Sequence, residues 1–181
     1  MVLTPFDKSS FKHLAKELYL ACFPFDERRE WSSILDLNQQ DYYSFFVIEQ
    51  DSLFVGIISL WFFKDFVYVE HFAIDKTLRG NHLGTQAISH IINNINANIV
   101  LEVELPTNEI SKKRIMFYKR LGFESFVQRY IQPPYTEQGQ SLELIVMFHQ
   151  DQPTTSFPSF ETIRHTLYLN VYSHNRGGDY C

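Results

Sequence analysis

The hydrophobic pattern of this chain changes period at one short loop near its centre, and this change limits the folds that the chain can adopt. Before the loop, three strand-like runs cover 44–49, 53–63 and 66–74, and the short turns between them are typical of β-hairpins. After the loop, apolar residues recur at helical spacing from Leu83 to Ile95. The sequence therefore predicts an antiparallel meander that leads into alternating helices and strands.

The flanking segments extend this order of elements. Helices are predicted over about 9–22 and about 109–121, and the stretch 23–29 separates the first of them from a further helix that ends at about Leu37. Strands are predicted over 99–105, near 124–131 and near 142–148. A tail helix is predicted after residue 160, because Ile163, Leu167 and Val171 follow one another at intervals of four. We expect an α+β fold with one central, mostly antiparallel sheet.

The length of 181 residues is that of a single domain. Proline, serine and threonine are frequent in 151–160, which is typical of a linker. We expect the domain to cover 1–150, with 151–181 as a linker and helical extension of the same domain. The tail helix is suited either to cover a sheet edge or to support a homodimer, and the sequence leaves both open.

Composition and charge exclude several classes of function. The net charge of -5 argues against a nucleic-acid partner, which requires clustered Lys and Arg. The most apolar run, 53–63, is too short to cross a membrane. The two cysteines, Cys22 and Cys181, fit no metal-binding spacing, so we expect no metal. Together with the absence of a basic and apolar leader, they predict a cytoplasmic protein.

The central loop has the composition of a phosphate-binding turn. A strand ending at Ile74 is followed by Arg79, Gly80 and Gly84, and Gly84 lies at the start of the long helix. The free N–H groups of a helix N-terminus attract phosphate, Arg79 adds a positive charge, and glycine allows a ligand to approach the backbone. From these residues alone, an ordinary strand-to-helix turn is an equal alternative.

Two motifs resemble those of the GNAT superfamily of acetyl-CoA-dependent N-acetyltransferases. The run 79–84, Arg-Gly-Asn-His-Leu-Gly, is similar to the family signature [Q/R]xxGx[G/A], with His82 in place of the first signature glycine. The run 114–123 resembles the second block, Ala-x-x-hydrophobic-Tyr-x-x-x-Gly-Phe, with Arg114 in place of a small residue. The order and spacing of the motifs also agree, and the resemblance covers about 45–148.

The resemblance implies a GNAT-like fold, in which a mixed sheet of about six or seven strands lies between helices in α/β/α layers. It also implies acetyl-CoA as co-substrate. The backbone of the strand before the loop would pair with the pantetheine arm, and the turn would hold the pyrophosphate. The implied cofactor-binding residues are Phe72, Ala73, Ile74, Arg79, Gly80, Asn81, His82, Leu83, Gly84, Thr85 and Asn108.

For catalysis, the resemblance implies that Tyr118 protonates the thiolate that leaves, whereas spacing alone favours a core aromatic on a helix face. A base must also take a proton from the amine, and we rank Glu70 first and Glu104 second. Strict alternation along the strand places Glu70 on the face of Phe72 and excludes contact with His71.

The predicted reaction moves an acetyl group to a primary amine of a small molecule by direct attack in a ternary complex, because no cysteine lies in the segments that carry the chemistry. We expect acidic and aromatic residues to bind this amine, namely Phe25, Glu27, Glu102, Tyr130 and Tyr135. For Glu102 and Glu104, a solvated sheet face is the alternative. A non-catalytic acyl-CoA sensor and an interaction protein on the same fold are the alternative functions.

Overall fold

The structure is a computed structural model that describes residues 1–136, 138–151 and 157–173 of the chain. Its strands are β1 (Val2–Pro5), β2 (Tyr43–Gln50), β3 (Leu53–Phe62), β4 (Val67–Ile74), β5 (Ile99–Glu104), β6 (Glu124–Ser125), β7 (Tyr130–Gln132) and β8 (Leu142–His149). Its α-helices are α1 (Lys12–Cys22), α2 (Trp31–Leu37), α3 (Leu83–Asn94), α4 (Glu109–Arg120) and α5 (Phe160–Leu167). Short helical turns are η1 (Phe6–Lys8), η2 (Phe25–Glu27), η3 (Lys76–Leu78) and the π-helical η4 (Tyr168–Tyr172).

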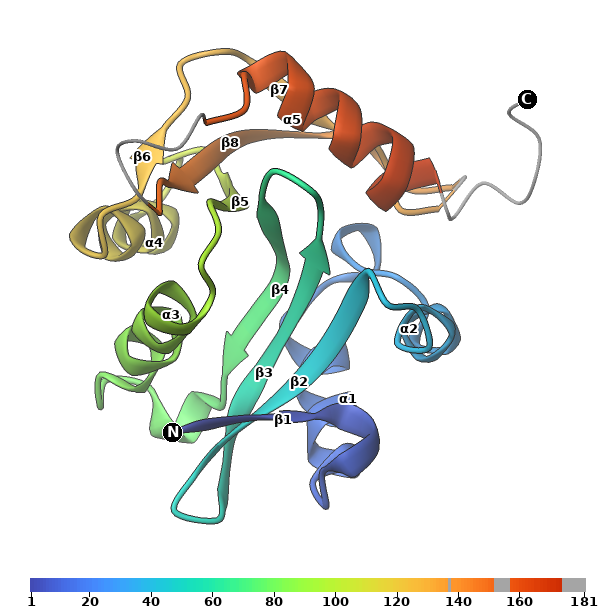
Figure 1. The fold of residues 1–181 in the computed structure, drawn as a ribbon, viewed down its shortest axis with the longest axis vertical. Coiled ribbons are helices and arrows are strands. Elements are labelled where there is room, and N and C mark those ends of the chain that lie inside the picture. Colours follow the sequence, from blue (N-terminus) through green and yellow to red (C-terminus); the bar gives the residue numbers. More distant parts are fainter. Residues whose placement is uncertain (137, 152–156, 174–181) are drawn as a thin grey trace.

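The strands form one sheet in the order β1-β2-β3-β4-β5-β8-β6, with β7 also paired to β8 (Figure 1). The β4–β5 pair is parallel, and all the other pairs are antiparallel. The prediction of a mostly antiparallel mixed sheet is therefore confirmed. The β2–β3 hairpin turns through Asp51 and Ser52, whose φ angles of 52° and 62° are typical of a two-residue type I′ turn.

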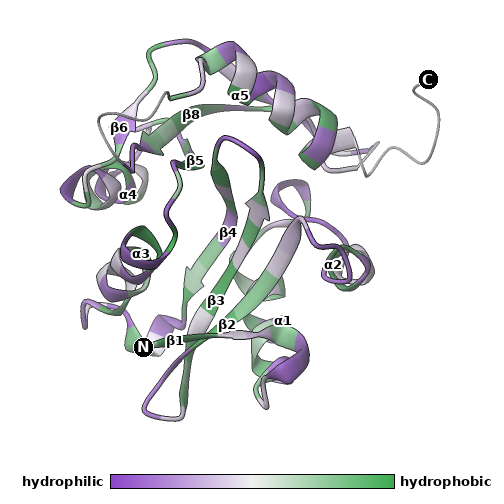
Figure 2. Cartoon of the chain, viewed as in Figure 1, coloured by the Kyte–Doolittle hydropathy of each residue, from purple (hydrophilic) through white to green (hydrophobic). Residues whose placement is uncertain are grey.

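Helices cover both faces of the sheet and divide the apolar core into two clusters. On one face, side chains of α1, α2, α5 and η4 pack against the sheet around the buried ring of Trp61. On the other face, α3 and α4 pack against Val67, Val69 and Leu101. The helices alternate between hydrophobic and hydrophilic stretches, as expected when one side of each faces a sheet (Figure 2). The α/β/α layers are as expected for the family.

Some predicted element boundaries were wrong. Strand β1 was missed, because its four residues carry no alternating pattern and are ordered by pairing with β2 at the sheet edge. The strand predicted near 124–131 is divided into β6 and β7, which both pair with β8. Helix α1 starts at Lys12, after Ser9 has accepted the N–H of Phe11.

The tail helix covers a face of the sheet. As the spacing predicted, Ile163, Leu167 and Val171 are buried, and all three belong to the cluster that contains Trp61. Half of the predicted linker, 152–156, and Cys181 lie outside the described residues. The homodimer stays a prediction. In the part of the chain that the structure describes, no helix is long and apolar enough to cross a membrane.

Candidate active site

The site is formed where β4 and β5 part from each other. The two strands pair through only three residues each, Val67–Val69 with Ile99–Leu101. Beyond this point β4 stays paired with β3, whereas β5 stays paired with β8. Figure 1 shows the two strands running to different parts of the molecule. The second half of β4 therefore has a backbone edge that β5 does not cover.

The uncovered edge of β4 includes the residues expected to pair with pantetheine. Asp75 donates its N–H to the Val55 carbonyl on β3, so by alternation the polar backbone groups of Ile74 and Phe72 point to the opposite edge. On that edge, the Ile74 carbonyl accepts a hydrogen bond from Arg79 Nε at 3.1 Å. Ala73 lies between them with its carbonyl against Gly56 of β3. Phe72 and Ile74, whose backbone groups point to this edge, belong to the strand that the family resemblance expects to pair with the pantetheine arm.

The turn between β4 and α3 presents backbone N–H groups to an approaching anion. Helix α3 has no side-chain cap, and its first backbone hydrogen bond runs from Gln86 N–H to the His82 carbonyl. The N–H groups of the preceding helical residues, Leu83, Gly84 and Thr85, thus have no intrahelical acceptor. Together with the helix dipole they fit a phosphate group.

The same turn lies against both other parts of the site. A Cβ on Gly84 would be 3.7 Å from the side chains of Ile74 on β4 and Phe117 on α4. Gly80 has a φ of 86°, which glycine adopts without strain. Arg79 reaches back to Ile74, and its Nη2 is 3.6 Å from Cys22 Sγ. Asn81 is exposed and its side-chain amide donates to the Leu78 carbonyl.

His82 occupies the position of a signature glycine and adopts a conformation that glycine favours. Its φ and ψ of 58° and 9° are left-handed, and it is the N-cap residue of α3 rather than a helical residue. Left-handed backbone costs a residue with a Cβ about 1–2 kcal/mol. A glycine at this position would avoid that cost, and the chain tolerates His82 there at the expense of strain.

Replacing His82 with glycine is expected to raise the free energy of unfolding by about 1 kcal/mol, because the left-handed strain is removed. Urea unfolding measures this change. The control is Gln86→Gly, one turn later in ordinary helix, which should lose about 0.5–1 kcal/mol. A His82→Gly variant that is destabilised like the control would contradict the explanation.

Asn108 lies at the start of α4 and acts as its N-cap. Its side-chain oxygen accepts the N–H groups of Ile110 and Ser111, each at 2.9 Å, and the Ser111 hydroxyl completes a capping box. The side-chain oxygen of Asn108 is therefore already used within the protein, as the cap of α4. The side-chain amide is exposed to solvent with the rest of the residue.

Tyr118 faces the sheet from α4. Its side chain is 7% exposed and packs edge-on against Phe117 and Phe123. Burial raises the pKa of the Tyr118 hydroxyl to about 12, with the nearby charges of Arg114 and Glu104 acting in opposite directions. The hydroxyl therefore keeps its proton at neutral pH, as a proton donor must.

Arg114, which departs from the small residue of the family pattern, forms an ion pair with Glu104. The guanidinium Nη1 of Arg114 on α4 donates to Glu104 Oε2 at the end of β5. Both side chains are nearly half exposed. Arg114 thus lies one helical turn before Tyr118 and partly neutralises the carboxylate that the sequence ranked as the second base.

The predicted orientation of Glu70 was wrong. A β-bulge occurs where Ser59 pairs with His71 and Leu60 pairs with Val69, so Glu70 is the extra residue of β4. The bulge interrupts the alternation and turns Glu70 to the same face as His71, with the His71 Nδ1 3.7 Å from the Glu70 carboxylate. A single-strand pattern carries no signal of the pairing partner, so the sequence could not reveal this bulge.

Glu70 is also fully buried and paired. Its carboxylate accepts Arg29 Nε at 2.9 Å and Trp61 Nε1 at 2.8 Å. Although burial raises its pKa, the Arg29 and His71 charges and these hydrogen bonds outweigh burial and lower the pKa to about 2. A carboxylate with so low a pKa and no solvent exposure is poorly suited to take a proton from an amine.

Arg29 was missed by the sequence analysis and is the centre of a buried cluster. Its guanidinium lies between the rings of Trp61 and Tyr135, at 5.3 and 5.2 Å. It also donates to the carbonyl of Val171 in η4. The cluster joins the segment before α2, the bulge of β4 and the C-terminal η4. No sequence signal separates Arg29 from the neighbouring Arg28.

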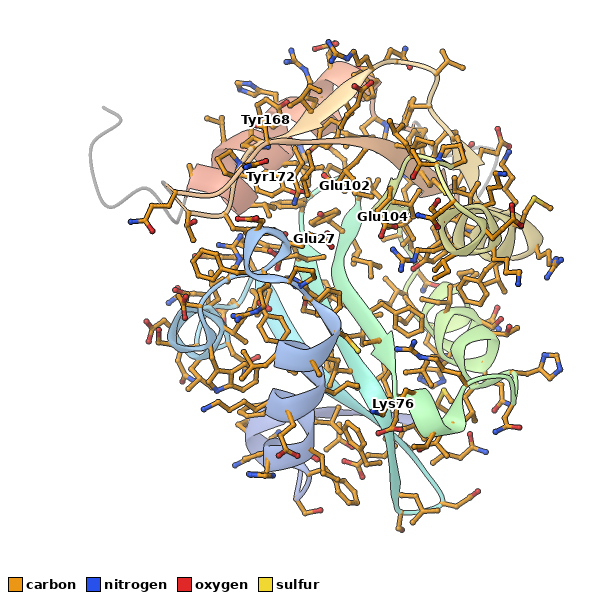
Figure 3. The ribbon with its side chains drawn as sticks, turned by 180° about the vertical axis from the view of Figure 1, so that it is seen from behind. Glu27, Lys76, Glu102, Glu104, Tyr168 and Tyr172 are labelled. Atoms are coloured by element: carbon orange, nitrogen blue, oxygen red, sulfur yellow. The ribbon has the colours of Figure 1, made fainter. Side chains whose placement is uncertain are left out.

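Glu102 lies on β5 at the first position beyond the β4–β5 pairing, and it is enclosed rather than solvated. Its Oε2 accepts the Tyr172 hydroxyl at 2.7 Å, and this hydroxyl is 3.2 Å from the Tyr68 hydroxyl. Burial raises the Glu102 pKa to about 7, although the nearby tyrosine hydroxyls oppose this shift. The side chain thus contacts the C-terminal η4, which Figure 3 shows beside it.

We expect Glu102 to make the protein less stable as pH rises. Its folded pKa of about 7 is above the ordinary value of 4.5, so the folded state holds a proton that the unfolded chain releases between these values. The free energy of unfolding should therefore fall by about 3 kcal/mol across this range from this group, then level off. Urea unfolding at several pH values tests this, because a Glu102→Gln variant should lack that part of the slope. Equal slopes would contradict the assignment.

The predicted amine-binding residues are divided between enclosed and accessible positions. Tyr130 and Tyr135 are buried under the C-terminal segment, and Tyr135 packs 5.3 Å from the ring of Tyr172. Phe25, which is 46% exposed, and Glu27 lie on η2 between α1 and α2. Tyr130 on β7 and Tyr135 in the β7–β8 loop are thus enclosed, whereas η2 is accessible.

Comparisons with known proteins agree with this geometry. The model of the acetyltransferase (GNAT) family matches residues 12–123. A solved structure from Bacteroides thetaiotaomicron, assigned to the GNAT acetyltransferases, is 33% identical, with 95% of this chain and 98% of that chain covered and a TM-score of 0.87. No curated protein matches the chain.

Two more distant structures share the fold. The ribosomal-protein-S18-alanine N-acetyltransferase of Escherichia coli has 17% identity, coverage of 88% and 99%, and a TM-score of 0.58. An acetyltransferase from Salmonella typhimurium, solved with its cofactor acetyl-CoA, has 18% identity, coverage of 88% and 98%, and a TM-score of 0.59.

Strands β4 and β5 part beside the uncapped N-terminus of α3, and the family match covers more than half of the chain. The chain belongs to the GNAT acetyltransferase family and is an acyltransferase enzyme. Acyl transfer in this family depends on acetyl-CoA. Among the described residues, no group of three or more His, Cys, Asp or Glu side chains could hold a metal ion.

Proposed function

We propose that this enzyme transfers an acetyl group from acetyl-CoA to a primary amine of a small molecule, by direct attack in a ternary complex. The observation that carries the proposal is that the uncapped first turn of α3 lies beside the side chain of Ile74, at the end of the stretch of β4 that β5 does not pair with. This arrangement suits a ligand with a phosphate at one end and an extended arm that pairs with backbone.

The proposed binding mode uses mainly backbone groups. The outward-facing N–H and C=O groups of Phe72 and Ile74 would pair with the pantetheine arm, as an added strand does. The N–H groups from Gly80 to Thr85 would hold the pyrophosphate, with Arg79 supplying a positive charge. Acetyl-CoA would supply the activated acetyl group as a thioester.

In the proposed chemistry, Tyr118 protonates the sulfur that leaves. Its hydroxyl is protonated at neutral pH and lies on the helix that packs against the turn through Phe117. Glu70 and Glu104, which the sequence favoured as bases, are paired with Arg29 and Arg114. We assign them the role of fixing the charge and shape of the site.

The small-molecule acceptor rests on the accessible, acidic character of η2 and on the net charge of -5. One structural neighbour is named for the N-terminal alanine of a ribosomal protein, so the fold by itself does not select an acceptor. A cytoplasmic location also stays a proposal, and it rests on the sparse cysteines.

The test is a coupled assay of purified protein with acetyl-CoA and a panel of primary amines: a polyamine, an amino sugar, an amino acid and a peptide with a free N-terminus. Release of the CoA thiol must be accompanied by an acetylated amine in the mass spectrum. Turnover of a small amine supports the proposal. Acetylation of the peptide alone, or thiol release without acetylated product, contradicts it.

The sensor alternative was suggested by His82 and Arg114. Each has a local setting in the structure, since His82 adopts a left-handed conformation that glycine favours and Arg114 pairs with Glu104. Neither residue is therefore a reason to expect loss of catalysis. Tight binding of acetyl-CoA without turnover of any amine would favour the sensor.

A further inference from the structure

We propose that Glu27 binds the ammonium group of the acceptor and takes its proton before attack. This inference rests on the proposed transfer to an amine and assigns the base that neither Glu70 nor Glu104 is suited to be. Glu27 is the last residue of η2, the short turn between α1 and α2.

The position of Glu27 is fixed relative to the bulge of β4. Its backbone carbonyl lies 3.4 Å from Nε2 of His71, which is two residues beyond Val69, the last β4 residue paired with β5. The His71 ring is buried between Tyr19 and Phe23, so it does not move freely. Glu27 is thereby anchored where β4 and β5 part.

The side chain of Glu27 lies in the same region as the other carboxylates of the site. Glu27 interacts electrostatically with Glu104, and Figure 3 shows both at the opposite end of β4 from Lys76. The charge of Glu104 raises the pKa of Glu27, and the charge of Arg114 lowers it. Glu104 and Arg114 in turn act on the Tyr118 hydroxyl. The proposed acid and base thus share two charged neighbours.

Glu27 differs from these carboxylates in its partners. Glu70 is neutralised by Arg29, Glu104 pairs with Arg114, and Glu102 is hydrogen-bonded by Tyr172. Among the described residues, no cation lies within ion-pair distance of the Glu27 carboxylate, although the side chain is only partly exposed. A partly desolvated carboxylate without a counter-ion is suited to bind an ammonium group.

Burial raises the pKa of Glu27, as do the charges of Glu104 and Asp26, whereas Arg114 and His71 lower it. A higher pKa makes the carboxylate a better proton acceptor. The rate should therefore rise with pH as Glu27 loses its proton.

The protons balance across the reaction. Glu27 takes one proton from the ammonium and passes it to water, which leaves a neutral amine. As the C–N bond forms and the C–S bond breaks, Tyr118 gives its proton to the sulfur. The nitrogen loses a second proton, which restores the Tyr118 hydroxyl. The products are an amide, the CoA thiol and one proton released to solvent.

The test compares Glu27→Gln with Glu30→Gln, an exposed residue on the same segment with the same change of charge. The probe is the small amine most active in the wild-type assay. We expect kcat/KM for the amine to fall about 100-fold in Glu27→Gln, with loss of the acidic limb of the pH profile. Glu30→Gln should stay within about twofold, and KM for acetyl-CoA should be unchanged in both. Equal rates in the two variants, or a retained acidic limb, would overturn the inference.

A second measurement does not need turnover. The Glu27 carboxyl is titrated by NMR in the wild type and in Glu104→Gln, assigned by its loss in Glu27→Gln. We expect a pKa above that of ordinary glutamates, which falls when the Glu104 charge is removed. An ordinary pKa that is insensitive to Glu104 would overturn the inference. Wild-type protein that acetylates no amine would instead contradict the proposed function.

Discussion

Replacing Tyr118 with phenylalanine should lower kcat by about 10²–10³-fold while the dissociation constant for acetyl-CoA changes less than twofold. The thiolate that leaves is then protonated only by water, whereas the phosphate and pantetheine contacts proposed for the turn and β4 involve no Tyr118 atom. Rapid-quench kinetics with a saturating amine measures the chemical step, and calorimetry measures binding.

The control for this variant is Tyr43→Phe. Tyr43 is also a fully buried tyrosine, but it lies on β2 in the core cluster on the opposite face of the sheet. Its replacement should leave kcat unchanged. An unchanged kcat in Tyr118→Phe would remove Tyr118 from the mechanism and return it to the role of a core aromatic, in contact with Phe117 and Phe123.

Replacing Arg29 with methionine should lower the free energy of unfolding by about 3–5 kcal/mol, because it leaves the buried Glu70 carboxylate without its counter-ion. The change also removes the donor to Val171, which holds η4 against the sheet. Urea unfolding at neutral pH measures the loss. Adding Glu70→Gln should recover part of it, since the uncompensated charge is then removed.

The matched control is Arg164→Met, which breaks an exposed pair with Glu161 and should cost much less, because solvent screens exposed pairs. The effect of Arg29→Met should also depend on pH. Arg29 is the largest of the influences that lower the Glu70 pKa from 4.5 to about 2, so the contribution of the pair is present above pH 4.5 and is lost as pH falls towards 2. A loss no larger than that of the control, or one that grows on acidification, would contradict the ion-pair account.

Local pattern was sufficient to predict most of the fold. The alternation of 99–105, the helical spacing after Leu83 and the short turns of the meander each have a local cause, and the structure contains the corresponding β5, α3 and hairpins. Strand β1 has no local sequence pattern that would predict it, because it is ordered by pairing with β2. The division of 124–131 into β6 and β7 likewise depends on their partner β8.

The backbone elements of the proposed site were predictable from the sequence, because they are neighbours in the chain. The turn from Arg79 to Thr85 and the edge of β4 lie together because a strand and the helix after it are close in sequence. The charged side chains were not predictable, because their partners are distant. Glu70 pairs with a residue 41 positions away, and its orientation depends on a bulge that only the β3 register defines.

His82 departs from the family motif at a position where the backbone is left-handed. Glycine adopts this conformation without strain, and here a histidine has it. Arg114 is similar, since its ion pair with Glu104 gives a large side chain a place that the family pattern reserves for a small one. In both cases the sequence shows the departure and only the structure gives its physical consequence.

The central claim is that the parted strands and the turn before α3 bind acetyl-CoA, and calorimetric titration of the purified protein tests it most directly. The account predicts saturable binding of one acetyl-CoA per chain, with affinity that falls as salt rises because phosphate contacts contribute. Absence of heat and of any shift in unfolding temperature at millimolar acetyl-CoA would contradict the claim.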